Sequence, residues 1–190
     1  EAIATASRFT SLRRLVLDHN ALGAVGIAAL DLLGRDNPLT ELSLKDCALG
    51  YHGANALVDT ATLKDLELLD LSLNRLTTAA LGILFESPSV FGLRVLSIAR
   101  NNASGSPCRV LSRSHHLANL RELDLTACQL TNDDVAAIAQ AECLAGIEVL
   151  ALGDNKINKE GAQALADSEV LENLRELDLR SNDLHSSGTS

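Results

Sequence analysis

The chain has 190 residues, of which 46% are hydrophobic and only 2% are aromatic. Its formal charge of −9 argues against nucleic acid as a main partner, because phosphate binding needs a basic surface. No apolar run approaches the roughly 18 residues that a membrane-spanning helix needs, so the sequence predicts no membrane segment.

Residues 1–11 are interpreted as the tail of a repeat that precedes the first complete one. Ile3 and Phe9 fall where the helix of such a repeat would place its apolar side chains, when the later pattern is extrapolated back. The chain is therefore expected to begin midway through a structural repeat.

An apolar anchor then recurs every 27 residues along the chain. In the first copy it opens the frame Leu12, Leu15, Leu17, Asn20 and Leu22, which has the form L-x-x-L-x-L-x-x-N/C-x-L. The seven anchors are Leu12, Leu39, Leu66, Leu93, Leu120, Ile147 and Leu174. A period of about 20–29 residues with this frame is typical of leucine-rich repeats, so the chain resembles a leucine-rich-repeat solenoid.

Each repeat combines two periodicities. Leu15 and Leu17 alternate with polar or exposed positions and so point to one face of a short strand, and Gly26 and Leu30 follow at helical spacing. The predicted strands centre on Leu15, Leu42, Leu69, Leu96, Leu123, Leu150 and Leu177. The sequence therefore predicts an α/β fold with one domain over residues 1–184. Its parallel sheet lines the concave side of a horseshoe, and helices of about ten residues cover the convex side.

The polar slot of the frame is occupied by Asn20, Cys47, Asn74, Asn101, Cys128, Asn155 and Asn182. A buried Asn in this slot can satisfy backbone groups in the bend after the strand, and a cysteine fits the same volume. The four cysteines form no C-x-x-C pair and do not cluster at either end. They are predicted to be reduced and buried, which favours an intracellular, cytoplasmic location.

The fourth repeat is the least regular. Ala103 replaces the last leucine of the frame, and residues 101–107 are rich in turn-forming types. The helix of this repeat is predicted to restart with Ser106 as its cap and Pro107 in its first turn.

Residues 185–190 are predicted to form a flexible polar tail, and neither end of the repeat array shows a polar cap. Solenoids need capped ends for solubility. The sequence is therefore interpreted as an excised part of a longer array, whose uncapped ends could associate end to end.

The repeat length, the full helix in each repeat and the mixture of Asn and Cys resemble the ribonuclease-inhibitor-like class of leucine-rich repeats. Residues 153–165 and 18–30 are particularly similar to that class. Related repeats occur in ribonuclease inhibitors, Ran GTPase-activating proteins and nucleotide-binding innate immune receptors. In these families the repeats bind other proteins or support such binding. The resemblance therefore implies a protein-binding scaffold; the alternative is a non-catalytic regulator, such as a GTPase-activator-like, autoinhibitory or structural segment.

Motifs for chemistry are missing from the sequence. It contains no phosphate-cradling glycine motif, no zinc-ligand spacing and no nucleophile elbow, so no enzyme activity, cofactor or metal is predicted. The adjacent His115 and His116 are interpreted as surface or helix-end residues. Asp133 and Asp134 are assigned to a helix start, where the helix dipole favours negative charge.

The strand positions between the core leucines predict which side chains line the concave face. Leu68, Leu73 and Val95 are apolar where a solvated strand should be polar, and Arg100 lies beside them in the frame. The later repeats place acidic side chains in the same columns. The predicted protein-binding residues are Leu68, Asp70, Leu73, Val95, Arg100, Glu122, Asp124, Glu176 and Asp178, and the acidic ones are expected to steer a basic region of the partner.

Overall fold

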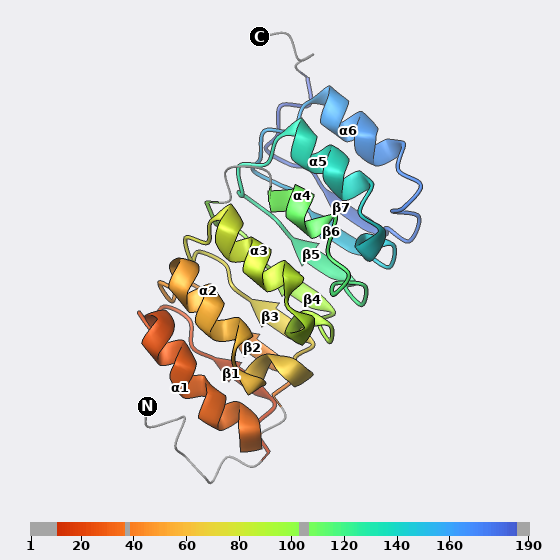
Figure 1. The fold of residues 1–190 in the computed structure, drawn as a ribbon. Helices are drawn as coiled ribbons and strands as arrows, with labels where there is room; N and C mark the ends of the chain where they lie inside the picture. Colours follow the sequence, from red (N-terminus) through yellow and green to blue (C-terminus); the bar gives the residue numbers. More distant parts are fainter. Residues whose placement is uncertain (1–10, 37–38, 103–106, 186–190) are drawn as a thin grey trace.

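A computed structural model describes residues 11–36, 39–102 and 107–185, which form one continuous solenoid (Figure 1). Seven short strands run parallel in the order of the sequence and form a single sheet. The strands are β1 (Arg14–Val16), β2 (Glu41–Ser43), β3 (Leu68–Asp70), β4 (Val95–Ser97), β5 (Glu122–Asp124), β6 (Val149–Ala151) and β7 (Glu176–Asp178). Each strand is centred on the leucine that the frame predicts.

The register of the sheet follows the repeat length. Each strand residue pairs with the residue 27 positions further along the chain, as Leu15 does with Leu42. Identical positions of the frame therefore stack in columns across the whole sheet. Because a column of the repeat frame is also a column on the surface, the spacing of the sequence identifies the residues of the concave face.

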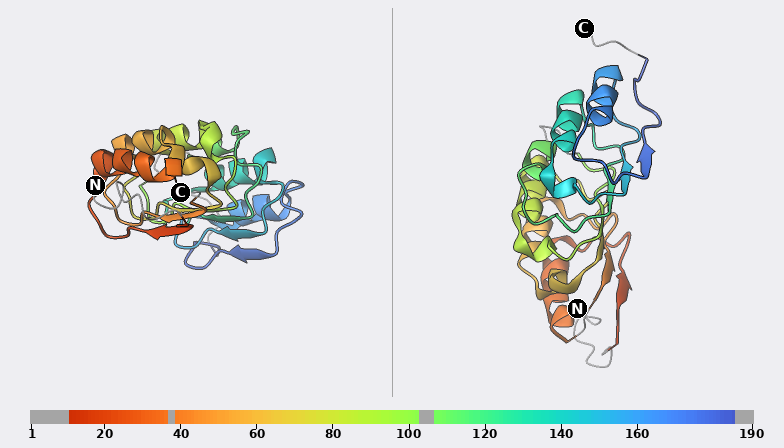
Figure 2. Two further views of the ribbon diagram at one scale, coloured as in Figure 1. Left: turned by 90° about the horizontal axis from the view of Figure 1, so that it is seen from below. Right: turned by 90° about the vertical axis from the view of Figure 1, so that its right-hand side faces the viewer.

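Helices connect successive strands and form a second layer. They are α1 (Gly23–Asp36), α2 (Gly50–Val58), α3 (Thr78–Glu86), α4 (Pro107–Leu111), α5 (Asn132–Ala139) and α6 (Lys159–Ala166). Three short 3-10 helices lie between an α-helix and the next strand: η1 (Ala61–Asp65), η2 (Pro88–Val90) and η3 (Glu142–Leu144). Figure 2 shows the helical layer on the convex side and the sheet on the concave side, as predicted.

The helix of the fourth repeat, α4, has only five residues, whereas the other α-helices have eight to fourteen. It begins at Pro107, whose missing N–H and fixed φ suit the first turn of a helix. The predicted cap, Ser106, lies outside the described residues. The uniform length of about ten residues was wrong for this repeat, because the turn-forming stretch before Pro107 takes residues that the other repeats give to the helix.

The helix α5 starts at the predicted acidic pair. Asp133 and Asp134 lie in its first turn, and the Thr131 backbone N–H donates to Asp134 Oδ2 at 3.0 Å. Asp134 is buried, at 3% exposure, so this carboxylate seals the helix start within the stack. The placement agrees with the expected preference of a helix N-terminus for negative charge.

The core lies between the two layers and consists of stacked leucine columns. Leu42, Leu69, Leu96, Leu123 and Leu150 are each at most 1% exposed. Phe85 of α3 is the largest fully buried side chain. The equivalent leucine of β7, Leu177, is 39% exposed because β7 is the last strand of the described sheet.

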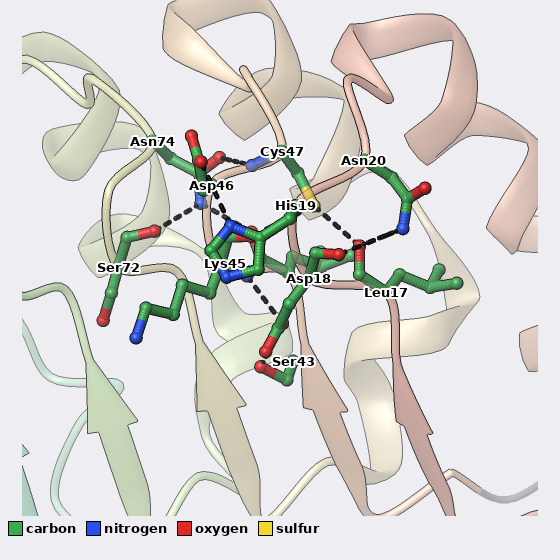
Figure 3. Close-up of polar contacts among 11 residues, drawn as sticks. Leu17, Asp18, His19, Asn20, Ser43, Lys45, Asp46, Cys47, Ser72 and Asn74 are labelled. Carbon is green, nitrogen blue, oxygen red and sulfur yellow. Dashed lines mark hydrogen bonds and ion pairs between the residues drawn. The ribbon is translucent and has the colours of Figure 1, made fainter.

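The polar slot forms a ladder between repeats, seen for the first three repeats in Figure 3. Asn74 is fully buried, and its Oδ1 accepts from the backbone N–H of Cys47 at 2.9 Å and of Leu49 at 3.3 Å. Its Nδ2 donates to the carbonyls of Leu44 and Leu71, at 2.7 and 3.0 Å. One side chain therefore satisfies backbone groups of its own repeat and of the preceding one.

Asn101 and Asn155 make the same contacts, and their Oδ1 atoms accept from the backbone N–H of Asn74 and Cys128, respectively. The two cysteines of the slot fulfil only half of this role. The thiols of Cys47 and Cys128 donate to main-chain carbonyls of the preceding repeat, at 3.1 and 3.2 Å, but they have no oxygen that could accept from its amides. The predicted structural role of the slot agrees with this geometry.

Candidate functional site

The solvent side of the strands forms two columns of side chains on the concave face. The first strand position gives Arg14, Glu41, Leu68, Val95, Glu122, Val149 and Glu176. The third strand position gives Val16, Ser43, Asp70, Ser97, Asp124, Ala151 and Asp178. Every acidic residue predicted for the site lies in one of these columns.

The predicted apolar spot is divided into two pairs. Leu68 and Val95 are direct partners across β3 and β4, at the start of the strands. Leu73 and Arg100 lie five residues further along each repeat, in the turns after those strands. Polar side chains such as Asp70 and Ser72 separate the pairs. The three apolar side chains are half-buried rather than exposed, because neighbouring repeats cover part of each one.

A ridge of left-handed residues follows the strands. Its members, with φ between 53° and 60°, are His19, Asp46, Leu73, Arg100, Ala127, Asp154 and Ser181. Their backbone is fixed by the next repeat; the Leu73 N–H donates to Ala99 O at 2.9 Å, for example. This conformation costs about 1–2 kcal/mol for an ordinary residue and less for Asn or Asp. Leu73 and Arg100 therefore occupy costly positions, and such strain is often retained at functional sites.

Three of the predicted acidic residues also have structural roles. Asp70 Oδ1 accepts from the backbone N–H of Ser72 at 2.8 Å, and Asp124 and Asp178 make the same bond two residues onward, at 2.9 and 3.0 Å. These carboxylates are thus held in fixed positions. The motif Asp-x-polar in the frame could have predicted this turn.

The carboxylates differ in how much charge they leave for a partner. Asp124 Oδ2 accepts from Ser97 Oγ at 3.0 Å, and Asp178 forms an ion pair of 2.8 Å with Arg180. Glu122 and Glu176 are exposed and stand in the neighbouring column. The later repeats therefore present an acidic surface that consists mainly of the two glutamates, with the aspartates partly neutralised.

The first two repeats carry a polar network on the same face (Figure 3). Asp18 Oδ1 accepts from Ser43 Oγ at 2.6 Å and from the Lys45 N–H at 3.0 Å. On the ridge, His19 Nδ1 lies 3.2 Å from Asp46 Oδ2. The His19–Asp46 pair is largely exposed, and exposed ion pairs contribute little to stability.

Within the described residues, no group of three or more His, Cys, Asp or Glu side chains is arranged to hold a metal ion. Nor does any helix there combine the length and hydrophobicity needed to cross a bilayer. Of the adjacent histidines that follow α4, His115 is exposed and His116 is half-buried. The arrangement offers shape, charge and apolar contact, which are the means of binding rather than of chemistry.

The four thiols are free and buried, as predicted. Burial raises the pKa of Cys128 and of Cys143 to about 11, and it raises the pKa of Cys47 and Cys108 as well. Because the thiolate is the reactive form, all four should resist modification in the folded protein.

We expect alkylation of the native protein with iodoacetamide at pH 8 to leave Cys47, Cys108, Cys128 and Cys143 unlabelled, while denatured protein takes up four labels. Mass spectrometry of the intact chain would check this result. Rapid native labelling of Cys108 or Cys128 would contradict their placement in the core.

Comparisons with known proteins agree with this architecture. A family model described as "Leucine Rich repeat" matches residues 10–30, 36–58, 116–139, 147–166 and 170–190, together more than half of the chain. Among solved structures, the TLR13–ssRNA13 complex aligns with a TM-score of 0.56 and 23% identity, over 93% of this chain and 29% of that chain. At this identity the likeness concerns the fold alone.

A second solved structure, the internalin inlF of Listeria monocytogenes str. 4b F2365, aligns with a TM-score of 0.46 and 18% identity, over 83% of this chain and 45% of that chain. The chain thus spans less than half the length of either neighbour. No curated protein sequence matches it.

Proposed function

The chain belongs to the leucine-rich repeat family, and we propose that it is a protein-binding scaffold that uses the concave face of its sheet. Leucine-rich repeats generally serve as binding modules, and this sheet is open along its whole length. The finer placement in the ribonuclease-inhibitor-like class stays a prediction. So does the end-to-end association of two chains, although the exposure of Leu177 leaves an apolar surface for it.

The observation that carries the proposal is the position of Leu73 and Arg100 on the left-handed ridge. The same ridge accepts aspartate at positions 46 and 154, where the conformation costs less. A leucine there offers apolar surface, and an arginine offers the guanidinium that protein interfaces favour. Together with the Leu68–Val95 pair they define the concave contact centre: Leu68, Leu73, Val95 and Arg100.

The acidic surface of the last three repeats supports a partner with a basic region. Glu122 and Glu176 are exposed in one column, and Asp124 and Asp178 are fixed beside them by hydrogen bonds. Such a surface accelerates the approach of a basic partner, and salt slows that approach. Asp70, in the same column nearer the contact centre, continues this surface toward it.

The free, buried thiols support an intracellular, cytoplasmic location, since a reducing compartment keeps cysteines unpaired. The acidic net charge favours protein over nucleic acid as the partner.

The test compares affinity capture by the wild-type chain with capture by a Leu68→Glu, Leu73→Glu variant. A protein retained by the wild type is then purified and titrated against both. We expect the double variant to lose at least about tenfold in affinity, which corresponds to about 1.4 kcal/mol. The matched control is Val25→Glu, because Val25 is 80% exposed on the convex helix α1 and should leave binding unchanged.

A second variant, Leu73→Asn, separates function from stability. Asparagine suits the left-handed conformation, so this change should stabilise the fold by about 1 kcal/mol while it weakens binding. A binding loss with Val25→Glu but not with the double variant would place the interface on the convex side. Full affinity in every variant would favour the alternative, a structural, autoinhibitory or GTPase-activator-like segment.

A further inference from the structure

An exposed aromatic side chain interrupts one column at the rim of the sheet where the strands begin. Phe91 is 55% exposed, and it is one of only three phenylalanines in the chain. The corresponding residues of neighbouring repeats are Lys64, Ala118, Ala145 and Glu172. None of them is aromatic, so the frame does not require an aromatic residue here.

Phe91 borders a surface hollow of about 380 Å³. The other lining residues are Lys64, Asp65, Glu67, Gly92, Arg94, Asn119 and Arg121. The backbone on both sides of the ring is fixed. Asn119 Nδ2 donates to Phe91 O at 2.8 Å, and a Cβ on Gly92 would lie 3.0 Å from the carbonyl oxygen of Leu66. This hollow, the rim pocket, is therefore a built feature of the third to fifth repeats.

Two arginines stand side by side in the rim pocket. Arg94 and Arg121 occupy the same position of successive repeats, where like charges repel each other. Their nearest acidic partners lie on opposite sides, Glu67 at 3.7 Å from Arg94 and Glu148 at 4.0 Å from Arg121. With Lys64 the pocket lining has three cationic and two acidic side chains, although the chain as a whole has a net charge of −9.

The rim pocket is continuous with the start of β3 and β4. Glu67 and Arg94 immediately precede Leu68 and Val95, the apolar pair on the concave side. A chain segment that crosses the rim would therefore meet an apolar pair on one side and an aromatic ring with cationic groups on the other.

We propose that the rim pocket binds an extended protein segment that carries a carboxylate next to an apolar side chain. Arg94, whose side chain is 62% exposed, and Lys64 bind the carboxylate. Arg121 is anchored by its Nη1 bonds to the carbonyls of Leu120 and Gly146, so it contributes charge from a fixed position. The apolar side chain packs on Phe91. The site does not depend on Leu73 or Arg100, which lie at the opposite ends of the strands.

The probe is a library of random dodecapeptides displayed on phage and selected on the wild-type chain. We expect the selected peptides to share an Asp or Glu beside an apolar residue. A synthetic selected peptide should lose at least about tenfold in affinity on Phe91→Ser and on Arg94→Gln. The matched control is Arg175→Gln: Arg175 has the same frame position and pairs with Glu148 at 3.2 Å, but it lies outside the pocket. Unchanged thermal midpoints would show that the variants are folded.

Three results would overturn the proposal: selected peptides without an acidic residue, affinities that Phe91→Ser and Arg94→Gln leave unchanged, or tight binding of a fluorescent ten-nucleotide uridine RNA that both variants abolish. The last outcome would assign the pocket to single-stranded nucleic acid, which also uses aromatic and cationic side chains. Leu73→Asn separates the two proposals, because it should weaken a concave-face partner and leave the rim-pocket peptide unaffected.

Discussion

Replacing Asn74 by leucine should lower the free energy of unfolding by about 3 kcal/mol, because it leaves buried backbone groups without partners at about 1–3 kcal/mol each. The groups at risk are the N–H of Cys47 and of Leu49, which Asn74 Oδ1 satisfies from the next repeat. The carbonyls of Leu44 and Leu71 would lose a donor as well. Chemical denaturation followed by circular dichroism measures this loss.

Asn20 offers a control in the same slot of the frame. Its side chain is exposed and makes bonds only within its own repeat, to the carbonyls of Leu17 and Asp18. Asn20→Ala should therefore cost less than about 1 kcal/mol. Asn74→Cys should fall between the two, since a thiol can donate to the preceding carbonyl but cannot replace the acceptor. Equal losses for Asn74→Leu and Asn20→Ala would show that the ladder does not hold the repeats together.

Alkaline pH should destabilise the fold through the buried thiols. The pKa of Cys128 is raised from 9.0 to about 11 by burial, so the unfolded chain loses this proton at a lower pH than the folded chain. The stabilisation is fully present below pH 9 and is lost as pH rises toward 11. At about 1.4 kcal/mol per pKa unit, this thiol alone should contribute a loss of about 3 kcal/mol.

Cys128→Ser isolates that contribution, because a hydroxyl can donate to the carbonyls of Ile98 and Thr126 as the thiol does but does not ionise in this range. Urea denaturation at pH 8, 9, 10 and 11 should show a steeper loss of stability in the wild type than in this variant. Parallel profiles would mean that the Cys128 thiol ionises without hindrance in the folded protein.

The sequence predicted the repeating part of the fold because each repeat solves the same packing problem. The period of 27 residues indicated the strand centres, the columns and the ladder, since a parallel sheet with one strand per repeat has no other simple register. The burial of Cys47 and Cys128 followed from their slot. The same reasoning failed for α4, whose five residues depend on a local turn that the frame does not describe.

The candidate site was harder to predict, because burial depends on neighbours in space. The columns correctly placed Leu68 beside Val95, but they did not show that Leu73 and Arg100 lie apart from this pair and in a left-handed turn. The exposed Phe91 was not predicted, since it lies at the rim and outside the strand positions. Its signal was present as an aromatic residue in a column of Lys, Ala and Glu.

The ladder also determines how the solenoid should come apart. Each slot asparagine supports the turn of the repeat before it, so the dependence between repeats is directional. Cys47 and Cys128 supply no acceptor, which leaves the turns of the first and fourth repeats without this support. Coupling between neighbouring units sets the cooperativity of a repeat array. The fourth repeat, which also has the shortest helix, is thus the natural boundary between two unfolding blocks, one on each side of Cys128.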